Sequence, residues 1–468
     1  MTTSTTASSS FDLLVIGAGQ GGGPLAGKAA EAGWRVALVE RAHVGGSCVN
    51  EGCTPTKTMV ASARVAHLAR RAADYGVRTG PVSVDLTTVR QRKRDIVERF
   101  RSGSKKGLTS KEGLTLLMGE ASFTGPRAVE VTLNDGGTRT LTAERIVVNT
   151  GTRPFIPPIE GLASVDYLTN SSIMELAEVP DHLVVLGGGY IGLEFGQMFH
   201  RFGSDVTIIQ RGDQLLDRED ADVAEAIADI LREQGLTVHL GTEASAVTQA
   251  ADGTITVTAT QDGNTVDAAG SHLLVATGRR PNTDALALEA AGLATDDRGY
   301  LPVNERLETD VPGIYAIGDV KGGPAFTHIS YDDYRILKAN WWENGDRTTE
   351  GRMVPYTVFI DPQLGRIGLS EEQARAAGHD MRVAHLPMTS VARALETDET
   401  HGFMKAVVDA NTDQILGATI LGVEGGEIAS VLQMAMMGNV PYTALRDGVF
   451  SHPTYTESLN NLFMAMEA

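Results

Sequence analysis

Cysteine is nearly absent from this sequence: only Cys48 and Cys53 occur among its 468 residues. Two cysteines cannot form the disulfide framework of a small secreted protein. A disulfide this local would also remove little conformational entropy from the unfolded chain. The alternatives are two buried free thiols or half of a metal site, but a tetrahedral site needs further ligands at short spacing, and no second cluster appears. We therefore expect redox chemistry from the pair and no bound metal.

An excess of positive charge and long apolar runs are also missing. The chain has 40 Lys and Arg against 59 Asp and Glu, which gives a net charge of −19. This balance argues against nucleic acid or an anionic membrane surface as a partner. No apolar run reaches the ~18 residues of a membrane helix. Residues 1–10 lack the basic and apolar regions of a signal peptide, so we expect a disordered lead-in and a cytoplasmic protein.

Glycine, by contrast, is abundant, and the first glycine-rich turn lies between residues 17 and 22. An apolar strand precedes this turn, a helix pattern runs from Pro24 to about Ala32, and a second strand ends at an acid. Strand, glycine turn, helix, strand and acid together form a dinucleotide fingerprint, in which the acid binds a ribose hydroxyl. The residues that match it are Gly17, Gly19, Gly22 and Glu40.

A second fingerprint begins at residue 182. An apolar strand leads into Gly187, Gly189 and Gly192, and the following helix holds Glu194. The position that Glu40 has in the first copy is occupied by Gln210, and Arg211 follows. Loss of the carboxylate and gain of a guanidinium suit a ribose 2′-phosphate. The two copies predict two different dinucleotides.

The segment that holds both cysteines, residues 45–57 (the cysteine segment), comes directly after the first fingerprint. We therefore expect the first dinucleotide and the cysteines to share one site. The residues beyond Cys53 are predicted to form a helix with Pro55 in its first turn. A helix N-terminus carries partial positive charge, which stabilises a thiolate.

The chain between the two fingerprints contains a basic stretch and several strands. Residues 90–106 favour a solvated helix face, and the alternative is a positive collar that draws in an anionic substrate. The pattern predicts a β-meander over residues 119–123, 129–133 and 139–142, then a separate buried strand over residues 145–151. Prolines at 154, 157 and 158 mark a domain boundary.

The last part of the chain has a different character. Residues 313–319 form an apolar strand that stops at Asp319, whose carboxylate suits a polyol or ribose. After residue 347 the pattern predicts an antiparallel sheet (353–360, 403–408, 415–421) with helices at 370–377 and 427–437. His452 and Glu457 lie five residues apart, which suits an imidazole oriented by a carboxylate, although such a histidine can also be a plain loop residue.

These motifs together make the sequence resemble the class I pyridine nucleotide-disulfide oxidoreductases, the family of glutathione reductase, lipoamide dehydrogenase and mercuric reductase. The resemblance covers residues 11–463. Residues 326–335 and 457–460 look most like the mercuric-reductase-like flavoproteins of reactive-chlorine and oxidant defence.

The resemblance implies an α/β fold with two Rossmann-like domains and a C-terminal α+β dimerisation domain. The FAD-binding domain would comprise residues 1–154 and 281–347, the NAD(P)H-binding domain residues 155–280, and the dimerisation domain residues 348–468. The cofactors would be FAD and NADPH, and the protein would be a homodimer with active sites shared between subunits.

The resemblance also implies a role for individual residues. Cys53 would be the thiol next to the flavin, and Cys48 the thiol that attacks substrate. Lys57 would lie beside the flavin N5, paired with Glu194, and Tyr190 would cover the nicotinamide pocket. His452, held by Glu457, would come from the partner subunit to protonate the leaving thiol.

Cofactor binding would involve further residues around both glycine turns. Glu40 would bind the adenosine ribose of FAD and Asp319 its ribitol chain. The other cofactor-binding residues would be Gly17, Gly19, Gly22, Gly46, Ser47, Lys57, Ala121, Thr150, Gly151, Gly187, Gly189, Gly192, Arg211, Arg218 and Gly278.

Two departures bear on the substrate. Mercuric reductase carries an additional C-terminal cysteine pair and often an N-terminal metal-binding module, and this sequence has neither. Conversely, mercuric reductase lacks a pair like His452 and Glu457. Arg211 argues against lipoamide dehydrogenase, which uses NAD. We therefore predict an NADPH-dependent reductase of a small disulfide or an oxidant such as hypothiocyanous acid. The alternatives are a Cu(II) or Hg(II) reductase, a lipoamide dehydrogenase and a flavin-based redox sensor.

Overall fold

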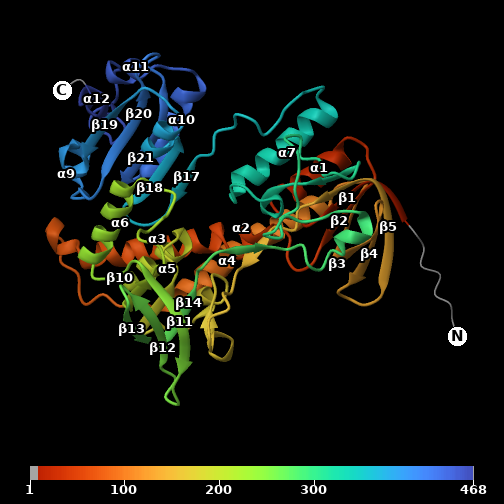
Figure 1. Ribbon diagram of the computed structural model, residues 1–468, viewed down its shortest axis with the longest axis horizontal. Helices are drawn as coiled ribbons and strands as arrows, with labels where there is room; N and C mark the ends of the chain where they lie inside the picture. Colours follow the sequence, from red (N-terminus) through yellow and green to blue (C-terminus); the bar gives the residue numbers. More distant parts are fainter. Residues whose placement is uncertain (1–8, 467–468) are drawn as a thin grey trace. The chain divides into compact units, whose positions relative to one another are not determined.

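A computed structural model describes residues 9–466 of the chain, which separate into two compact units (Figure 1). The first unit contains residues up to 58, 91–155 and 279–352, and the second contains residues 59–90, 156–278 and 353 onwards. Residues 59–90, which we assigned to the first domain, therefore cluster with the second unit. The division into three domains stays a prediction.

The first unit is organised around a mainly parallel sheet. Its strands are β1 (Ser9–Ile16), β2 (Val36–Glu40), β3 (Leu114–Gly125), β4 (Ala128–Leu133), β5 (Thr138–Val148) and β16 (Ile314–Ala316). β3, β2, β1, β5 and β16 pair in parallel, and β4 pairs antiparallel with both β3 and β5. The apolar run of β1 is fully buried, as expected for a parallel strand covered on both faces. Helices α1 (Gly22–Glu31) and α7 (Thr327–Trp342) contact each other and pack beside this sheet (Figure 1).

Two sequence predictions about this sheet are wrong. Ser9 and Ser10 were placed in a disordered lead-in, but they begin β1 and pair with Leu141 and Thr142 of β5. The pairing uses backbone groups, so polar side chains do not prevent it. β5 is also one continuous strand rather than two, and it ends at Val148. Its first half completes the meander and its second half lies between β1 and β16. The rest of the predicted lead-in lies outside the described residues.

Other elements of the first unit include the helices that carry the cysteines. These elements are α2 (Gly46–Asn50), the start of α3 (Cys53–Arg70), most of α4 (Leu86–Thr109), and the 3-10 turn η5 (Gly318–Lys321). The short strands β6 (Thr152–Pro154) and β15 (Arg279–Pro281) pair antiparallel.

The second unit contains a second parallel sheet, as the second fingerprint predicts. Its order is β10 (Thr237–His239), β9 (Asp205–Ile209), β8 (His182–Leu186), β14 (His272–Val275) and β7 (Tyr167–Leu168). Helices α5 (Tyr190–Phe202) and α6 (Ala221–Glu233) belong to it. A three-stranded antiparallel sheet is formed by β11 (Thr242–Gln249), β12 (Ile255–Gln261) and β13 (Asn264–Gly270).

The C-terminal residues of the second unit form a five-stranded antiparallel sheet. Its order is β17 (Tyr356–Val358), β18 (Gln363–Gly368), β21 (Ile415–Gly422), β20 (Phe403–Asp409) and β19 (Met381–Pro387). Its helices are α8 (Glu371–Ala376), α9 (Ala392–Glu396), α10 (Gly425–Met437), α11 (Tyr442–Arg446) and α12 (Ser458–Met464). The two mainly parallel sheets with glycine turns and the five-stranded antiparallel sheet of the C-terminal residues confirm the predicted fold class.

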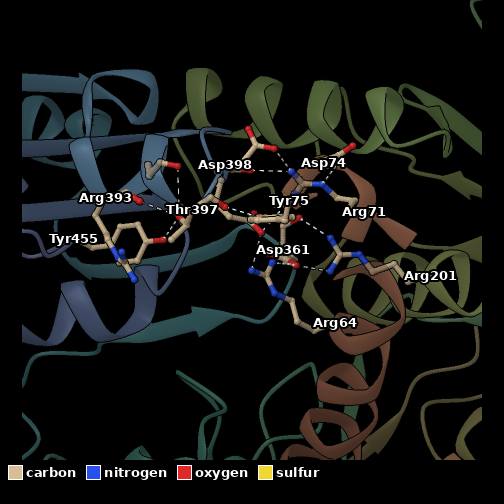
Figure 2. Close-up of polar contacts among 12 residues, drawn as sticks. Arg64, Arg71, Asp74, Tyr75, Arg201, Asp361, Arg393, Thr397, Asp398 and Tyr455 are labelled. Carbon is tan, nitrogen blue, oxygen red and sulfur yellow. Dashed lines mark hydrogen bonds and ion pairs between the residues drawn. The ribbon is translucent and has the colours of Figure 1, made fainter. Parts of the chain in front are cut away.

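A polar cluster within the second unit holds the C-terminal half of α3. Figure 2 shows Arg64 of α3 and Arg201 of α5 converging on the carboxylate of Asp361. Arg64 also donates to Glu399 at 2.9 Å. Two guanidiniums hold the pKa of Asp361 below its usual range, against the effect of burial.

Within residues 9–466, no helix combines the length and apolar character needed to cross a membrane.

Candidate active site

The first glycine turn leaves no room for side chains. Gly17 has φ +104°, and a Cβ there would lie 2.4 Å from the carbonyl oxygen of Asn149. A Cβ on Gly22 would lie 2.2 Å from the carbonyl oxygen of Gly17. Asn149, which follows β5, also donates from Nδ2 to that oxygen at 3.1 Å. Sequence reasoning missed Asn149, because only the return of β5 to the turn reveals it.

Glu40 and Gln210 occupy matching places in the two units. The Oε2 atom of Glu40 accepts from the backbone N–H of Ala18 at 2.9 Å, and its Oε1 accepts from Ala42 at 2.8 Å. Gln210 follows β9, and its Oε1 accepts from the N–H of Gly188 at 2.9 Å. Each side chain bonds the residue after the first glycine of its own turn. The second unit therefore keeps this contact but replaces a carboxylate with a neutral amide.

The second glycine turn has the same close backbone contacts as the first, but there is open space beside one of its glycines. Gly187 has φ +111°, and a Cβ there would lie 2.4 Å from Ala276 O. A Cβ on Gly192 would lie 2.0 Å from Gly187 O. At Gly189 and Gly278, by contrast, an added Cβ would meet no described atom within 4 Å. Open space at the start of α5 fits a diphosphate, which backbone N–H groups at a helix N-terminus bind.

The cysteine segment lies directly on the first glycine turn. The N–H of Gly45 donates to Ala18 O at 2.9 Å, and Gln20 Nε2 donates to Gly45 O at 2.9 Å. Gly46 has φ +64°, and a Cβ there would lie 2.7 Å from the Cα of Gly19. The structure thus brings the first dinucleotide turn and the cysteine segment together, as their order in the sequence predicts.

The two cysteines are free thiols with different environments. Cys48 lies in α2, and Cys53 is the first residue of α3. A hydrogen bond from the Cys48 thiol is the main reason that the pKa of Cys53 falls to about 6; burial opposes it, while Thr327 and the Lys57 charge assist. The same hydrogen bond and burial raise the pKa of Cys48. The negative charge of the pair therefore resides on Cys53.

This finding changes the predicted cause of thiolate formation. The sequence predicted that the helix N-terminus stabilises the thiolate, but the neighbouring thiol contributes most. Thr327, whose Oγ1 lies 3.2 Å from Cys53 Sγ, was also missed. It lies 274 residues further along the chain, at the start of α7, so only the fold reveals the contact.

Asp319 lies in a fixed turn beside β16. Thr152 Oγ1 donates to its Oδ2 at 3.1 Å, and Arg279 Nε donates to that hydroxyl at 2.7 Å. Burial raises the pKa of Asp319. Beneath the turn, the fully buried Asp333 accepts from the N–H of Gly318 at 2.8 Å and anchors the backbone next to Asp319. This anchor and the bond from Thr152 together give the carboxylate of Asp319 a defined position.

His452 and Glu457 form the predicted pair. His452 Nδ1 lies 2.9 Å from both carboxylate oxygens of Glu457. Thr454 Oγ1 accepts from the N–H of Glu457 at 3.1 Å, and Tyr455 hydrogen-bonds to Thr397 Oγ1 at 2.6 Å (Figure 2). The His452 side chain is 68% exposed. With Nδ1–H directed at the carboxylate, Nε2 is available for proton exchange.

Four predicted residues of the second unit lie on α5 or in the loop after β9. Tyr190 is 38% exposed at the start of α5, and Glu194 is buried and accepts from the N–H of Phe359 at 2.8 Å. Arg211 and Arg218 are exposed and form no ion pair with any residue between 9 and 466. The predicted pairing of Lys57 with Glu194 joins residues of different units and stays a prediction.

The remaining predicted residues have less distinctive surroundings. Ser47 is exposed, and Ala121 is buried in β3. Thr150 Oγ1 donates to Asn282 O at 2.8 Å, and a Cβ added to Gly151, at φ +67°, would meet no described atom within 4 Å.

In the described part of the chain, no group of three or more His, Cys, Asp and Glu side chains could hold a metal ion.

The prediction of a solvated face for the basic stretch holds for most of its side chains, because five of them are exposed: Arg92, Arg94, Arg99, Lys105 and Lys106. α4 forms there, but Lys93 is only 3% exposed. Arg92 donates to Thr58 O and Arg101 donates to Asn50 Oδ1, each at 2.7 Å. Arg101 thus binds the cysteine segment and Arg92 binds the residue directly after it, at acceptors that sequence alone does not place near α4.

Comparison with known proteins shows which family the chain belongs to. The family model described as pyridine nucleotide-disulphide oxidoreductase matches residues 11–333, and the model of its dimerisation domain matches residues 354–463. The chain is 39% identical over 457 residues to the probable pyridine nucleotide-disulfide oxidoreductase RclA of Escherichia coli K12, covering 97% of this chain and 98% of RclA. It is 37% identical over 450 residues to a Staphylococcus aureus mercuric reductase, covering 96% of this chain and 81% of that protein.

A solved structure gives the same result. The structure of the HOCl-induced flavoprotein disulfide reductase RclA from Escherichia coli superposes with a TM-score of 0.88 at 38% identity, covering 97% of this chain and 99% of that one. RclA has also been solved as a Cu(II) complex, with a TM-score of 0.89 at the same identity and coverage. This chain therefore belongs to the pyridine nucleotide-disulphide oxidoreductase family of flavoprotein enzymes, which use FAD and a nicotinamide coenzyme, and it carries the family's dimerisation domain.

Proposed function

We propose that this protein is a cytoplasmic, NADPH-dependent disulfide reductase whose Cys48–Cys53 pair reduces a small disulfide or an oxidant such as hypothiocyanous acid. The observation that carries this proposal is the polarised cysteine pair on the first dinucleotide turn. When bound, FAD supplies the two-electron relay between the nicotinamide coenzyme and the cysteines. The Lys57 charge, which lowers the pKa of Cys53, supports a role for Lys57 on the cofactor side of the pair.

The two cysteines have different tasks in the reaction. Cys48 sulfur attacks one sulfur of the substrate disulfide, and the other sulfur leaves as a thiolate. The Cys53 thiolate then attacks Cys48 in the mixed disulfide, which releases the second product thiolate and closes the protein disulfide. Cys53 suits the second step because Thr327 and the Lys57 charge, which both lower its pKa, still act on it when the Cys48 thiol has been consumed in the mixed disulfide.

Cys48 needs a base, because its own pKa is raised. We assign this task to His452, which takes the proton from Cys48 and returns it to the leaving thiolate. Glu457 keeps the proton on Nδ1 and leaves Nε2 for the exchange. The dimerisation domain and the exposure of His452 support a homodimer in which each histidine serves the partner's cysteines.

The acceptor is tested by measuring NADPH oxidation with disulfides, hypothiocyanous acid, quinones, Cu(II) and Hg(II). We expect turnover with a disulfide or hypothiocyanous acid and its loss in Cys48→Ser. A metal reductase is the second candidate, because the relatives include mercuric reductase and a Cu(II) complex of RclA. Turnover that survives loss of Cys48 would contradict a disulfide reductase. Absence of turnover with every acceptor would instead favour a redox sensor.

Residues of the loop after β9 predict that the protein prefers NADPH to NADH. NADPH and NADH differ only in the 2′-phosphate, and Gln210 brings no negative charge to repel it. Arg211 offers a planar donor fork that suits phosphate, and Arg218 adds a second positive charge. A hydrogen bond to a charged group contributes roughly 1.5–3 kcal/mol. This corresponds to about 10- to 150-fold in affinity, so we expect at least that preference for NADPH, expressed mainly in KM.

Steady-state kcat/KM values for both coenzymes measure this preference. Arg211→Ala should remove most of it, and Gln210→Glu should shift it towards NADH. Arg232→Ala is the matched control, because Arg232 is an arginine on the surface of α6 that is paired with Asp229. Equal kcat/KM values for the two coenzymes in the wild type would contradict the prediction.

A further inference from the structure

Asn50 lies between the two cysteines and holds the segment that precedes them. Its Nδ2 donates to Gly46 O at 2.9 Å and to Val44 O at 3.1 Å. Gly46 is the residue that lies against Gly19 of the dinucleotide turn. A single amide therefore connects the end of α2, which contains Cys48, to the loop that rests on this turn.

Arg101 fixes the orientation of that amide. Its Nε donates to Asn50 Oδ1 at 2.7 Å, and because a guanidinium only donates, the amide oxygen must face α4 and the amide nitrogen must face the loop. The bond is charge-assisted and hence stronger than a neutral one. Arg92 of the same helix donates to Thr58 O beyond Cys53. α4 thus holds the chain on both sides of Cys53, at Asn50 and at Thr58.

We propose that Asn50 and Arg101 are positioning residues that lower the reduction potential of the Cys48–Cys53 couple, an inference that rests on the proposed function. A disulfide requires the two Sγ atoms about 2.05 Å apart and a narrow range of Cα separations. Holding α2 in place limits the conformations open to the dithiol without preventing this approach. Release of α2 gives the dithiol more freedom than the disulfide, so the equilibrium shifts towards the dithiol and the potential rises.

The equilibrium that reports this potential is exchange with glutathione. The two protein thiols and one glutathione disulfide give the protein disulfide and two glutathione thiols. The glutathione S–S bond breaks and the Cys48–Cys53 bond forms. The two glutathione sulfurs take up the Cys48 proton and one proton from solvent, because Cys53 is already a thiolate. Two electrons leave the protein, so a tenfold change in the equilibrium constant corresponds to about 30 mV.

The experiment equilibrates the FAD-loaded enzyme anaerobically with glutathione buffers and counts the thiols by mass after acid quenching and alkylation. Arg101→Met keeps the apolar stem but removes every donor. We expect its equilibrium constant for disulfide formation to fall by about tenfold, which raises the potential by about 30 mV. Asn50→Asp keeps the acceptor for Arg101 but loses both amide donors, and we expect a shift in the same direction.

Controls separate positioning from general stability. Arg99→Met removes an exposed arginine from the same helix and should leave the potential unchanged. Arg101→Lys restores one donor and should bring the potential part of the way back. Potentials equal to wild type in Arg101→Met and Asn50→Asp would overturn the proposal, even if both lower the melting temperature. If Arg101→Met does not fold, Asn50→Asp alone decides.

The same data distinguish failure of this inference from failure of the proposed function. If the cysteines are not a redox couple, the wild type will keep two thiols at every glutathione ratio. If only the inference fails, the wild type will titrate from two thiols to none, and the variants will follow the same curve.

Discussion

In the Cys48→Ser enzyme, we expect disulfide reduction to fall by roughly 10⁴-fold or more, as removal of a catalytic nucleophile does in other enzymes. Serine cannot form the mixed disulfide, and Cys53 alone cannot close an internal one. Binding of NADPH should be unaffected, because Arg211 and Gln210 belong to the other unit. Measured steady-state turnover with the best disulfide acceptor tests this, and retained turnover would contradict it.

Cys48 should also control the pH at which Cys53 ionises. In the reduced wild type, the rate at which iodoacetamide alkylates Cys53 should rise with pH around a midpoint of about 6, because only the thiolate reacts. Cys48→Ala removes the hydrogen bond that contributes most to this low pKa, so its midpoint should move to higher pH. Cys48→Ser keeps a hydroxyl donor and should move it less. An unchanged midpoint in Cys48→Ala would show that the hydrogen bond is not the cause.

Loss of His452 has the second largest expected effect. A positioned acid or base typically contributes ~10²–10⁴-fold, and the raised pKa of Cys48 makes a base necessary. His452→Ala should therefore lose about this factor in the reduction of substrate by the dithiol. Stopped-flow measurement of each half-reaction separates this step from oxidation of NADPH, which should keep its normal rate.

A mixing experiment tests whether the site is shared between subunits. His452→Ala subunits retain both cysteines, and Cys48→Ser subunits retain the histidine. If each histidine serves the partner's cysteines, a heterodimer of the two inactive chains contains one complete site, and activity should return. No return of activity, with subunit exchange demonstrated by mass spectrometry, would contradict the shared site.

The features that could be predicted from the sequence are local ones. Each dinucleotide fingerprint is contained in about thirty residues, and the spacing of its glycines is enough to predict strand, turn and helix. The pair formed by His452 and Glu457 is likewise separated by only five residues. The antiparallel C-terminal sheet was predicted only in part. β18 and β19 were missed, because β18 has two glycines and a buried arginine, and β19 carries charged and polar side chains.

The features that could not be predicted depend on residues far apart in the chain. Thr327 reaches Cys53 only because α7 begins beside α3, and Arg101 reaches Asn50 only because α4 packs on the cysteine segment. In sequence, Arg101 belongs to a basic stretch that resembles a solvated face. A local pattern gives the charge of such a residue but not its partner.

The central claim is that electrons from NADPH arrive at Cys48 and Cys53, and thiol counting tests it most directly. The chain has no other cysteine, so the count has no background. The oxidised, FAD-loaded enzyme is treated anaerobically with NADPH, denatured in acid, alkylated and weighed. The proposed function predicts that each subunit changes from no thiols to two, and that Cys48→Ser shows one thiol before and after NADPH. Two thiols in the wild-type enzyme before NADPH is added, under conditions in which it turns over, would contradict it.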